Sequence, residues 1–174
     1  GGILLVGKGG SGKSTTALAC LDSDLLYAGD DYCLLEVEPE PFVHSLYNSA
    51  KLNPDNLERF PALGRLFALP SARIEEKALV FLNEQVPHKL TTGFPLKGVF
   101  LPRVTGLADT SLEPISPAVA MRALAPSSLF QLCGAGHEGF AVMAKLIRQV
   151  PCYQLNLGTD LPGVTAAISR FLSE

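Results

Sequence analysis

A glycine-rich loop between an apolar segment and a helical segment constrains this chain more than any other feature. Residues 3–6 read Ile-Leu-Leu-Val, an unbroken apolar run that predicts a central strand buried on both faces of a parallel sheet. Residues 7–14 then read GKGGSGKS, which satisfies the spacing G-x-x-x-x-G-K-[ST], and residues 15–21 predict a short helix. A strand, a glycine loop and a helix in this order predict a phosphate-binding loop.

The residue types of this loop suit a nucleoside triphosphate with its Mg²⁺ ion. Glycines let backbone N–H groups turn inward around an anion, and the positive end of the following helix adds a favourable field. Lys13 is expected to reach the β- and γ-phosphates and to act in catalysis, while the Ser14 hydroxyl is expected to bind Mg²⁺. The predicted nucleotide-binding residues are Gly7, Lys8, Gly9, Gly10, Ser11, Gly12, Lys13, Ser14 and Thr15.

Length and composition favour a single soluble domain. The chain has 174 residues, of which 47% are apolar, so residues 1–174 are expected to form one P-loop domain. Charged residues make up 18%, which is low and favours extensive burial or a homo-oligomer. A net charge of −3 without a Lys/Arg-rich run disfavours nucleic acid, and the N-terminal apolar run is too short to cross a membrane. We therefore expect a cytoplasmic protein.

Two further features of the sequence bear on the site. The sequence opens without Met at the strand that feeds the loop, so we expect preceding N-terminal strands to lie outside it. The cysteines lack C-x-x-C spacing, which disfavours a zinc site and predicts reduced, mostly buried thiols. They are Cys20, Cys33, Cys133 and Cys152.

The rest of the chain alternates between strand and helix patterns. Strands are predicted at residues 25–29, 32–37, 98–102 and 152–157, and helices at residues 74–82, 117–124, 139–150 and 163–172. Residues 38–101 are rich in Pro and Asn and are expected to form short helices and loops that cover the site. Together with the phosphate loop, this alternation predicts an α/β, P-loop NTPase-like layered domain with a mostly parallel or mixed central sheet.

Two adjacent carboxylates, Asp30 and Asp31, follow the strand predicted at residues 25–29. The carboxyl end of a strand lies at the sheet edge where such loops bind ligands, so the pair is expected to lie near the phosphate loop. Neighbouring carboxylates ionise together only when a cation or a proton lies between them, and Mg²⁺ supplies that charge. One carboxylate would then join the metal shell while the other accepts a proton from an attacking hydroxyl. The alternative is a turn in which both side chains cap backbone groups.

The segments GKGGSGKSTTALACL and LLYAGDDYCLL resemble the HPr serine kinase/phosphorylase-like branch of P-loop proteins, which has a phosphoenolpyruvate carboxykinase-type fold. Softer similarities in VHSLYNSAKL, EEKALVFL, PLKGVFLPRV and VPCYQLNLGTDLPGVTAAI extend over most of the chain. The resemblance implies that Asp30 is the base that deprotonates the acceptor hydroxyl. It also implies that Ser14 and Asp31 hold Mg²⁺.

This sequence departs from the main members of that family in three ways. Thr15 stands where they carry Glu, the strand with their catalytic His would precede residue 1, and their Arg-bearing signature is not recognisable. These differences favour an acceptor other than HPr. Arg103, at the end of the strand predicted at residues 98–102, is a candidate for neutralising charge during transfer, with a surface arginine as the alternative.

The sequence therefore predicts a kinase that uses ATP and Mg²⁺ and transfers the γ-phosphoryl group to a hydroxyl on a peptide, a protein or a small molecule. No N-K-x-D motif of the GTPase kind is present, which favours ATP over GTP. Two alternatives belong to other classes of protein. The loop also fits the deviant form K-G-G-x-G-K-[ST], which resembles ParA/MinD partition ATPases, in which Lys8 would act across a dimer. The second alternative is a non-catalytic nucleotide-binding regulatory module.

Overall fold

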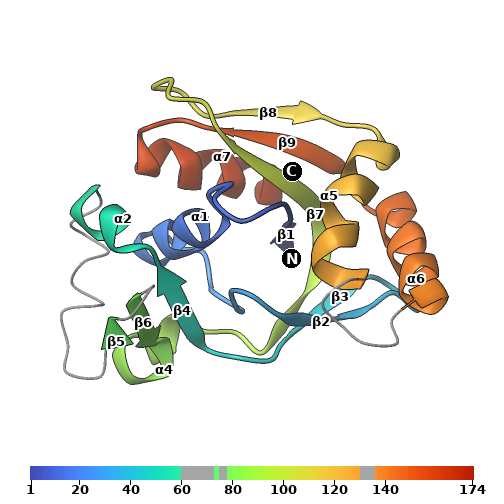
Figure 1. The fold of residues 1–174 in the computed structure, drawn as a ribbon, viewed down its shortest axis with the longest axis horizontal. Coiled ribbons are helices and arrows are strands. Elements are labelled where there is room, and N and C mark those ends of the chain that lie inside the picture. The colour runs from blue at the N-terminus through green and yellow to red at the C-terminus, as the bar shows by residue number, and fades with distance from the viewer. Residues whose placement is uncertain (60–72, 75–77, 130–135) are drawn as a thin grey trace. The chain divides into compact units, whose positions relative to one another are not determined.

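A computed structural model describes residues 1–59, 73–74, 78–129 and 136–174 of this chain. Figure 1 shows the helices and strands of these residues. Their bounds are β1 (Gly2–Leu5), α1 (Lys13–Ala19), η1 (Cys20–Asp22), β2 (Cys33–Glu36), β3 (Phe42–Ser45), β4 (Ser49–Leu52), α2 (Pro54–Arg59), β5 (Arg73–Ile74), β6 (Ala78–Phe81), α4 (Leu82–Gln85), η2 (Pro87–Lys89), β7 (Gly93–Val104), β8 (Ser111–Pro114), α5 (Pro117–Leu129), α6 (Gly136–Gln149), β9 (Cys152–Leu157) and α7 (Leu161–Ser173).

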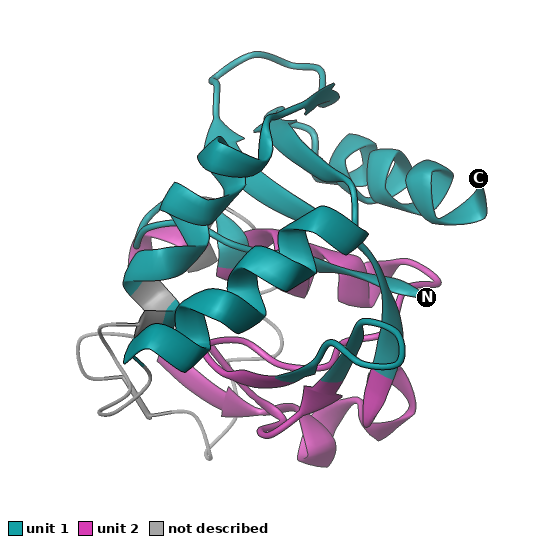
Figure 2. Ribbon diagram, turned by 90° about the vertical axis from the view of Figure 1, so that its right-hand side faces the viewer, with its two compact units in different colours: residues 1–13, 35–43, 94–174 teal, residues 14–34, 44–93 magenta. Residues whose placement is uncertain are grey.

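The chain divides into two compact units (Figure 2). Unit 1 contains Gly1–Lys13, Leu35–Val43 and Phe94–Glu174, and unit 2 contains Ser14–Leu34 and His44–Gly93. None of the helices that the structure describes is long and apolar enough to cross a lipid bilayer.

Unit 1 is built on a mixed sheet with the strand order β2-β3-β7-β9-β8, in which β1 also pairs with β7. The pairings β1–β7 and β7–β9 are parallel, whereas β8–β9 is antiparallel. The predicted α/β class with a mixed sheet is therefore confirmed. Among the described strands, β1 pairs with β7 alone and all its residues are partly exposed, so the prediction of a central strand buried on both faces is wrong. A short apolar run fits any half-buried strand, and it does not encode how many neighbours that strand has.

One face of β7 and β9 packs against the C-terminal helix α7. Phe100 of β7 and Tyr153 of β9 are register partners, and Phe171 of α7 makes edge-to-face contacts with both rings. Gly98 leaves room for this helix, since an added Cβ would lie 2.9 Å from the Phe171 ring. α7 itself begins at an N-cap, Asp160, whose carboxylate accepts a hydrogen bond from the Gly163 N–H at 3.0 Å.

Unit 2 has its own apolar core around the antiparallel pair β4–β6. Buried side chains from α1, η1, β4, β6 and α4 meet there: Leu18, Leu21, Tyr27, Ala50, Leu52, Ala78, Val80 and Leu82. In β4 the buried residues alternate with exposed ones, so Ala50 and Leu52 point into the core and Lys51 points outward. This core holds the second half of α1 through Leu18 and holds β4 through Ala50 and Leu52.

Several predicted elements differ from the observed ones. Residues 25–29 form no strand, and Tyr27 makes only an isolated bridge with Leu90. In the helix predicted at residues 74–82, Ala78–Phe81 instead form strand β6, while residues 75–77 lie outside the described part of the chain. Residues 38–101, where short helices and loops were expected, also contain the strands β3, β4 and β6.

Candidate functional site

The glycine loop, defined here as residues Gly7–Lys13 of unit 1, has a backbone that depends on its glycines. Gly7, Gly10 and Gly12 have φ values of 139°, 79° and 102°, which other residues rarely adopt. The loop lies against the carboxyl ends of two parallel strands, since a Cβ on Gly12 would lie 2.5 Å from Leu157 Cδ1 and 3.6 Å from Val104 Cγ2. This is the sheet edge at which open α/β sheets bind ligands.

Two polar side chains of the loop support a phosphate-binding role. The Lys13 ammonium donates hydrogen bonds to the carbonyl oxygens of Gly7, at 2.7 Å, and Lys8, at 3.0 Å, which holds it across the first turn of the loop. Ser11 Oγ is the one buried side-chain oxygen without a hydrogen-bond partner among the residues that the structure describes. An unpartnered buried hydroxyl is costly, and a phosphate oxygen would satisfy it. The loop therefore fits the triphosphate that its sequence predicts.

In unit 2, the residue after Lys13 bonds directly to the acidic pair. The Ser14 hydroxyl donates to Asp30 Oδ1 at 2.8 Å, and both side chains are partly buried. Ser14 lies in the first turn of α1, whose residues Thr16, Leu18 and Ala19 are buried. A hydroxyl and a carboxylate in contact are suitable oxygen ligands for Mg²⁺. No described group of three or more His, Cys, Asp or Glu side chains suits a metal.

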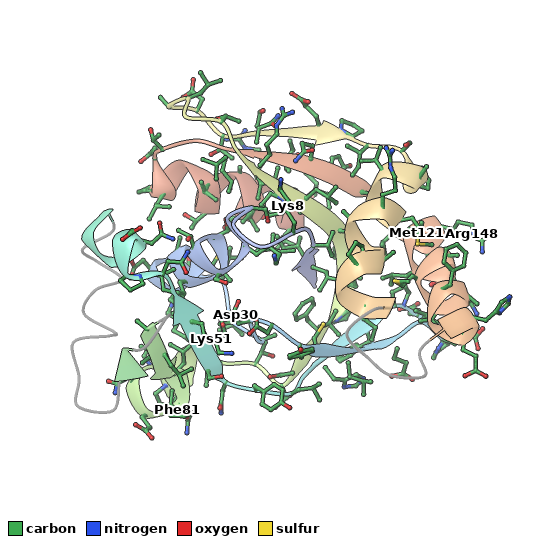
Figure 3. All side chains as sticks on the ribbon, in the orientation of Figure 1. Lys8, Asp30, Lys51, Phe81, Met121 and Arg148 are labelled. Atoms are coloured by element: carbon green, nitrogen blue, oxygen red, sulfur yellow. The ribbon has the colours of Figure 1, made fainter. Side chains whose placement is uncertain are left out.

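Asp31 has a different partner from Asp30. Its Oδ2 accepts a hydrogen bond from Lys51 Nζ at 3.1 Å, and the same lysine donates its backbone N–H to Asp30 Oδ2 at 3.1 Å. Figure 3 shows Lys51 beside Asp30. Ser14 therefore contacts Asp30 rather than Asp31, whereas the sequence paired Ser14 with Asp31.

The pKa of the buried Tyr27 phenol is affected by the charges of the acidic pair. Its ring is 4% exposed in the core of unit 2, and its hydroxyl donates to the carbonyl oxygen of Ser49 at 3.3 Å. Burial raises the pKa of the Tyr27 phenol, and the negative charges of Asp30 and Asp31 raise it further. The phenol is therefore protonated and neutral in the folded protein.

The Arg103 side chain lies on the face of the sheet opposite to the side chains that contact the glycine loop. Its guanidinium donates two hydrogen bonds to Asn156 Oδ1, at 3.0 and 2.6 Å. Side chains alternate along a strand, so Arg103 lies on the opposite face of β7 from Val104, whose side chain is the one near Gly12. Asn156 in turn donates to Ser111 Oγ, which makes Arg103 the end of a network on that second face. This geometry does not bring Arg103 to the phosphate loop.

The other residues singled out in the sequence have simple surroundings. The Lys8 side chain is exposed, and Thr15 Oγ1 accepts a hydrogen bond from Asn56 Nδ2 at 3.4 Å. Cys20, Cys33 and Cys152 are free thiols, although only Cys152 is fully buried; burial raises the pKa of Cys20 to about 12. Cys133 lies outside the described residues.

Sequence reasoning missed Lys51, which contacts both members of the acidic pair. The signal was weak but present, because the run Ser-Ala-Lys-Leu alternates small or apolar residues with polar ones, as a half-buried strand does.

In comparisons with known proteins, no family model, curated protein or solved structure matches the chain.

Proposed function

We propose that this protein is an ATP- and Mg²⁺-dependent phosphotransferase that moves the γ-phosphoryl group to a hydroxyl acceptor on a peptide, a protein or a small molecule. The observation that carries the proposal is the 2.8 Å hydrogen bond from Ser14 to Asp30. In proteins that bind nucleotides through a G-x-x-x-x-G-K-[ST] loop, the hydroxyl after the lysine and an acidic residue from a separate segment hold the metal. Asp30 also accepts a hydrogen bond from the Lys51 backbone N–H, as the capping alternative expects, but capping alone does not account for its contact with the Ser14 hydroxyl.

The loop residues have distinct tasks in this proposal. Backbone N–H groups of the glycine loop bind the phosphate oxygens, and Lys13 neutralises charge on the β- and γ-phosphates. Ser11 Oγ offers a further hydrogen bond to a phosphate oxygen, since it has no described partner in the protein. Ser14 and Asp30 would hold Mg²⁺, which supplies positive charge for the developing negative charge on the phosphates.

We propose to exchange the roles that the sequence suggested for the two aspartates, because their contacts differ. Asp30 contacts the metal-binding serine, whereas Asp31 is exposed and bonded to Lys51. We therefore assign Asp30 to the metal and Asp31 to the proton. Asp31 accepts the proton of the acceptor hydroxyl while the oxygen of that hydroxyl forms a bond to the γ-phosphorus. The bond between the γ-phosphorus and the bridging oxygen breaks, and ADP leaves with that electron pair.

Separate substitution of the two aspartates tests this assignment. In Asp30→Asn, we expect the Mg²⁺ concentration needed for half-maximal transfer to rise by roughly tenfold or more, since a charged ligand is lost. In Asp31→Asn, we expect kcat to fall by about 10²- to 10⁴-fold at saturating Mg²⁺, with ATP binding retained. Full transfer activity in Asp31→Asn would remove it from the mechanism.

The reaction itself is tested with γ-labelled ATP and a panel of hydroxyl acceptors. A kinase moves the label to an acceptor, and Lys13→Ala should abolish that transfer. Release of the label as inorganic phosphate without any labelled acceptor would instead indicate an ATPase of the switch type. Label that stays on ATP under all conditions would indicate a binding module and would contradict the proposal.

A further inference from the structure

The contacts of Lys51 suggest a role that no sequence motif assigns. Lys51 lies at the outward-facing position of β4 and contacts both carboxylates through different atoms. Its backbone N–H binds Asp30, and its ammonium binds Asp31. We infer that Lys51 is the positioning residue of the acidic pair, which offsets one of the two negative charges of the pair and aims Asp31 at the acceptor hydroxyl; this inference rests on the proposed phosphotransferase function.

The packing of β4 holds the backbone of Lys51 in a fixed position. Ala50 and Leu52, its neighbours in the strand, are 1% and 2% exposed in the core of unit 2. Antiparallel pairing places Lys51 opposite Leu79 of β6. The backbone N–H that binds Asp30 is therefore fixed by packing and pairing, and it does not depend on the lysine side chain.

The ammonium of Lys51 acts through its charge, and this effect can be separated from that of the backbone N–H. Adjacent carboxylates repel each other, and a cation beside one of them lowers that repulsion. The same positive charge repels a second cation that approaches the pair, so Lys51 limits the affinity of the pair for a divalent ion. Removal of the ammonium should therefore weaken catalysis and strengthen metal binding. Damage to the fold would weaken both, so the opposite signs identify the positioning role.

The informative variant is Lys51→Met, which keeps the backbone N–H and much of the side-chain volume. In the nucleotide-free protein, Mn²⁺ binding followed by electron paramagnetic resonance should become about two- to fivefold tighter, the size expected for loss of one exposed ion pair. In the transfer reaction, kcat should fall by about ten- to a hundredfold, because Asp31 loses its orientation. KM for ATP should stay within about twofold, because Lys51 does not belong to the glycine loop.

Two further variants serve as controls. Lys51→Arg retains the charge and a donor at this position, so it should restore most of kcat and the Mn²⁺ affinity of the wild type. Lys97→Met removes the same charge from an exposed position of β7 in unit 1 and should change neither quantity. Unchanged kcat and Mn²⁺ affinity in Lys51→Met would overturn the inference, as would a joint loss of both that Lys51→Arg does not rescue.

The metal measurement separates this inference from the proposed function. If the wild type phosphorylates no acceptor while Lys51→Met binds Mn²⁺ more tightly, the phosphotransferase proposal fails and the charge-neutralising role of Lys51 stands. If the wild type phosphorylates an acceptor and Lys51→Met behaves like the wild type in both measurements, the inference fails alone.

Discussion

The glycines of the glycine loop differ in whether another residue could replace them. Gly12 has a φ of 102°, and an added Cβ would approach Leu157. Gly9 has no positive φ, and an added Cβ would meet nothing within 4 Å. The loop therefore needs glycine at position 12 because of its backbone, whereas Gly9 offers a matched position where the backbone makes no such demand.

Gly12→Ala should lower the free energy of unfolding by about 1–3 kcal/mol, since alanine is strained at that φ. Gly9→Ala should change it by less than about 0.5 kcal/mol. Urea unfolding followed by circular dichroism measures both. Equal stability of the two variants would show that the loop backbone adapts to a side chain at position 12, and the rigid anion-binding turn would lose its support.

At the scale of elements, sequence patterns succeeded where one local signal sufficed. The strand predicted at residues 152–157 coincides with β9, and the helices α5, α6 and α7 appear where apolar periodicity predicted them. The run at residues 78–81 also fits a helix, but Ala78 and Val80 both point into the core of unit 2 with a period of two. Pairing with β4 decided the outcome, and a local pattern carries no information about that partner.

The same limit explains which parts of the site were foreseen. The glycine loop and the acidic pair are short local motifs that can be read directly from the sequence, while the phosphate binding expected of them stays a prediction. The choice of Asp30 over Asp31 as the partner of Ser14, and the presence of Lys51, depend on where β4 lies in unit 2. Segments that are distant in sequence meet through the core of that unit, which no motif records.

The core of unit 2 can be tested at the strand that carries Lys51. Leu52 is 2% exposed, so Leu52→Ala should lower the free energy of unfolding by about 2–5 kcal/mol through lost burial and a cavity. Lys51→Met, one residue earlier on the exposed face, should cost less than about 1 kcal/mol. The urea midpoint measures both. A larger loss in Lys51→Met than in Leu52→Ala would contradict the assignment of inward and outward faces in β4.

For the whole molecule, the important fact is that neither unit is a continuous segment. The chain passes between the units after Lys13, Leu34, Val43 and Gly93. A cut after Leu34 or Val43 would divide both units, whereas a cut after Lys13 or Gly93 would divide unit 1 and keep the segments of unit 2 together. Every one of these cuts divides unit 1, which contains the glycine loop, so the proposed nucleotide binding is tested on the complete chain. The first of these boundaries falls inside the sequence motif, between Lys13 and Ser14.

Ligand binding to the complete chain gives the broadest test of the proposed site. A ligand that binds only the folded protein at a hundred times its Kd stabilises it by about 2.7 kcal/mol. For a chain of this size, that corresponds to a rise in Tm of roughly 5–10 °C.

With Mg²⁺ and a non-hydrolysable ATP analogue, we expect such a rise in the wild type and in Asp31→Asn, because the proposed proton acceptor contributes little to nucleotide binding. Lys13→Ala should show a much smaller rise, since it loses the ammonium that is proposed to bind the phosphates. A wild-type Tm that does not respond to millimolar analogue would contradict nucleotide binding itself, and with it every catalytic role assigned above.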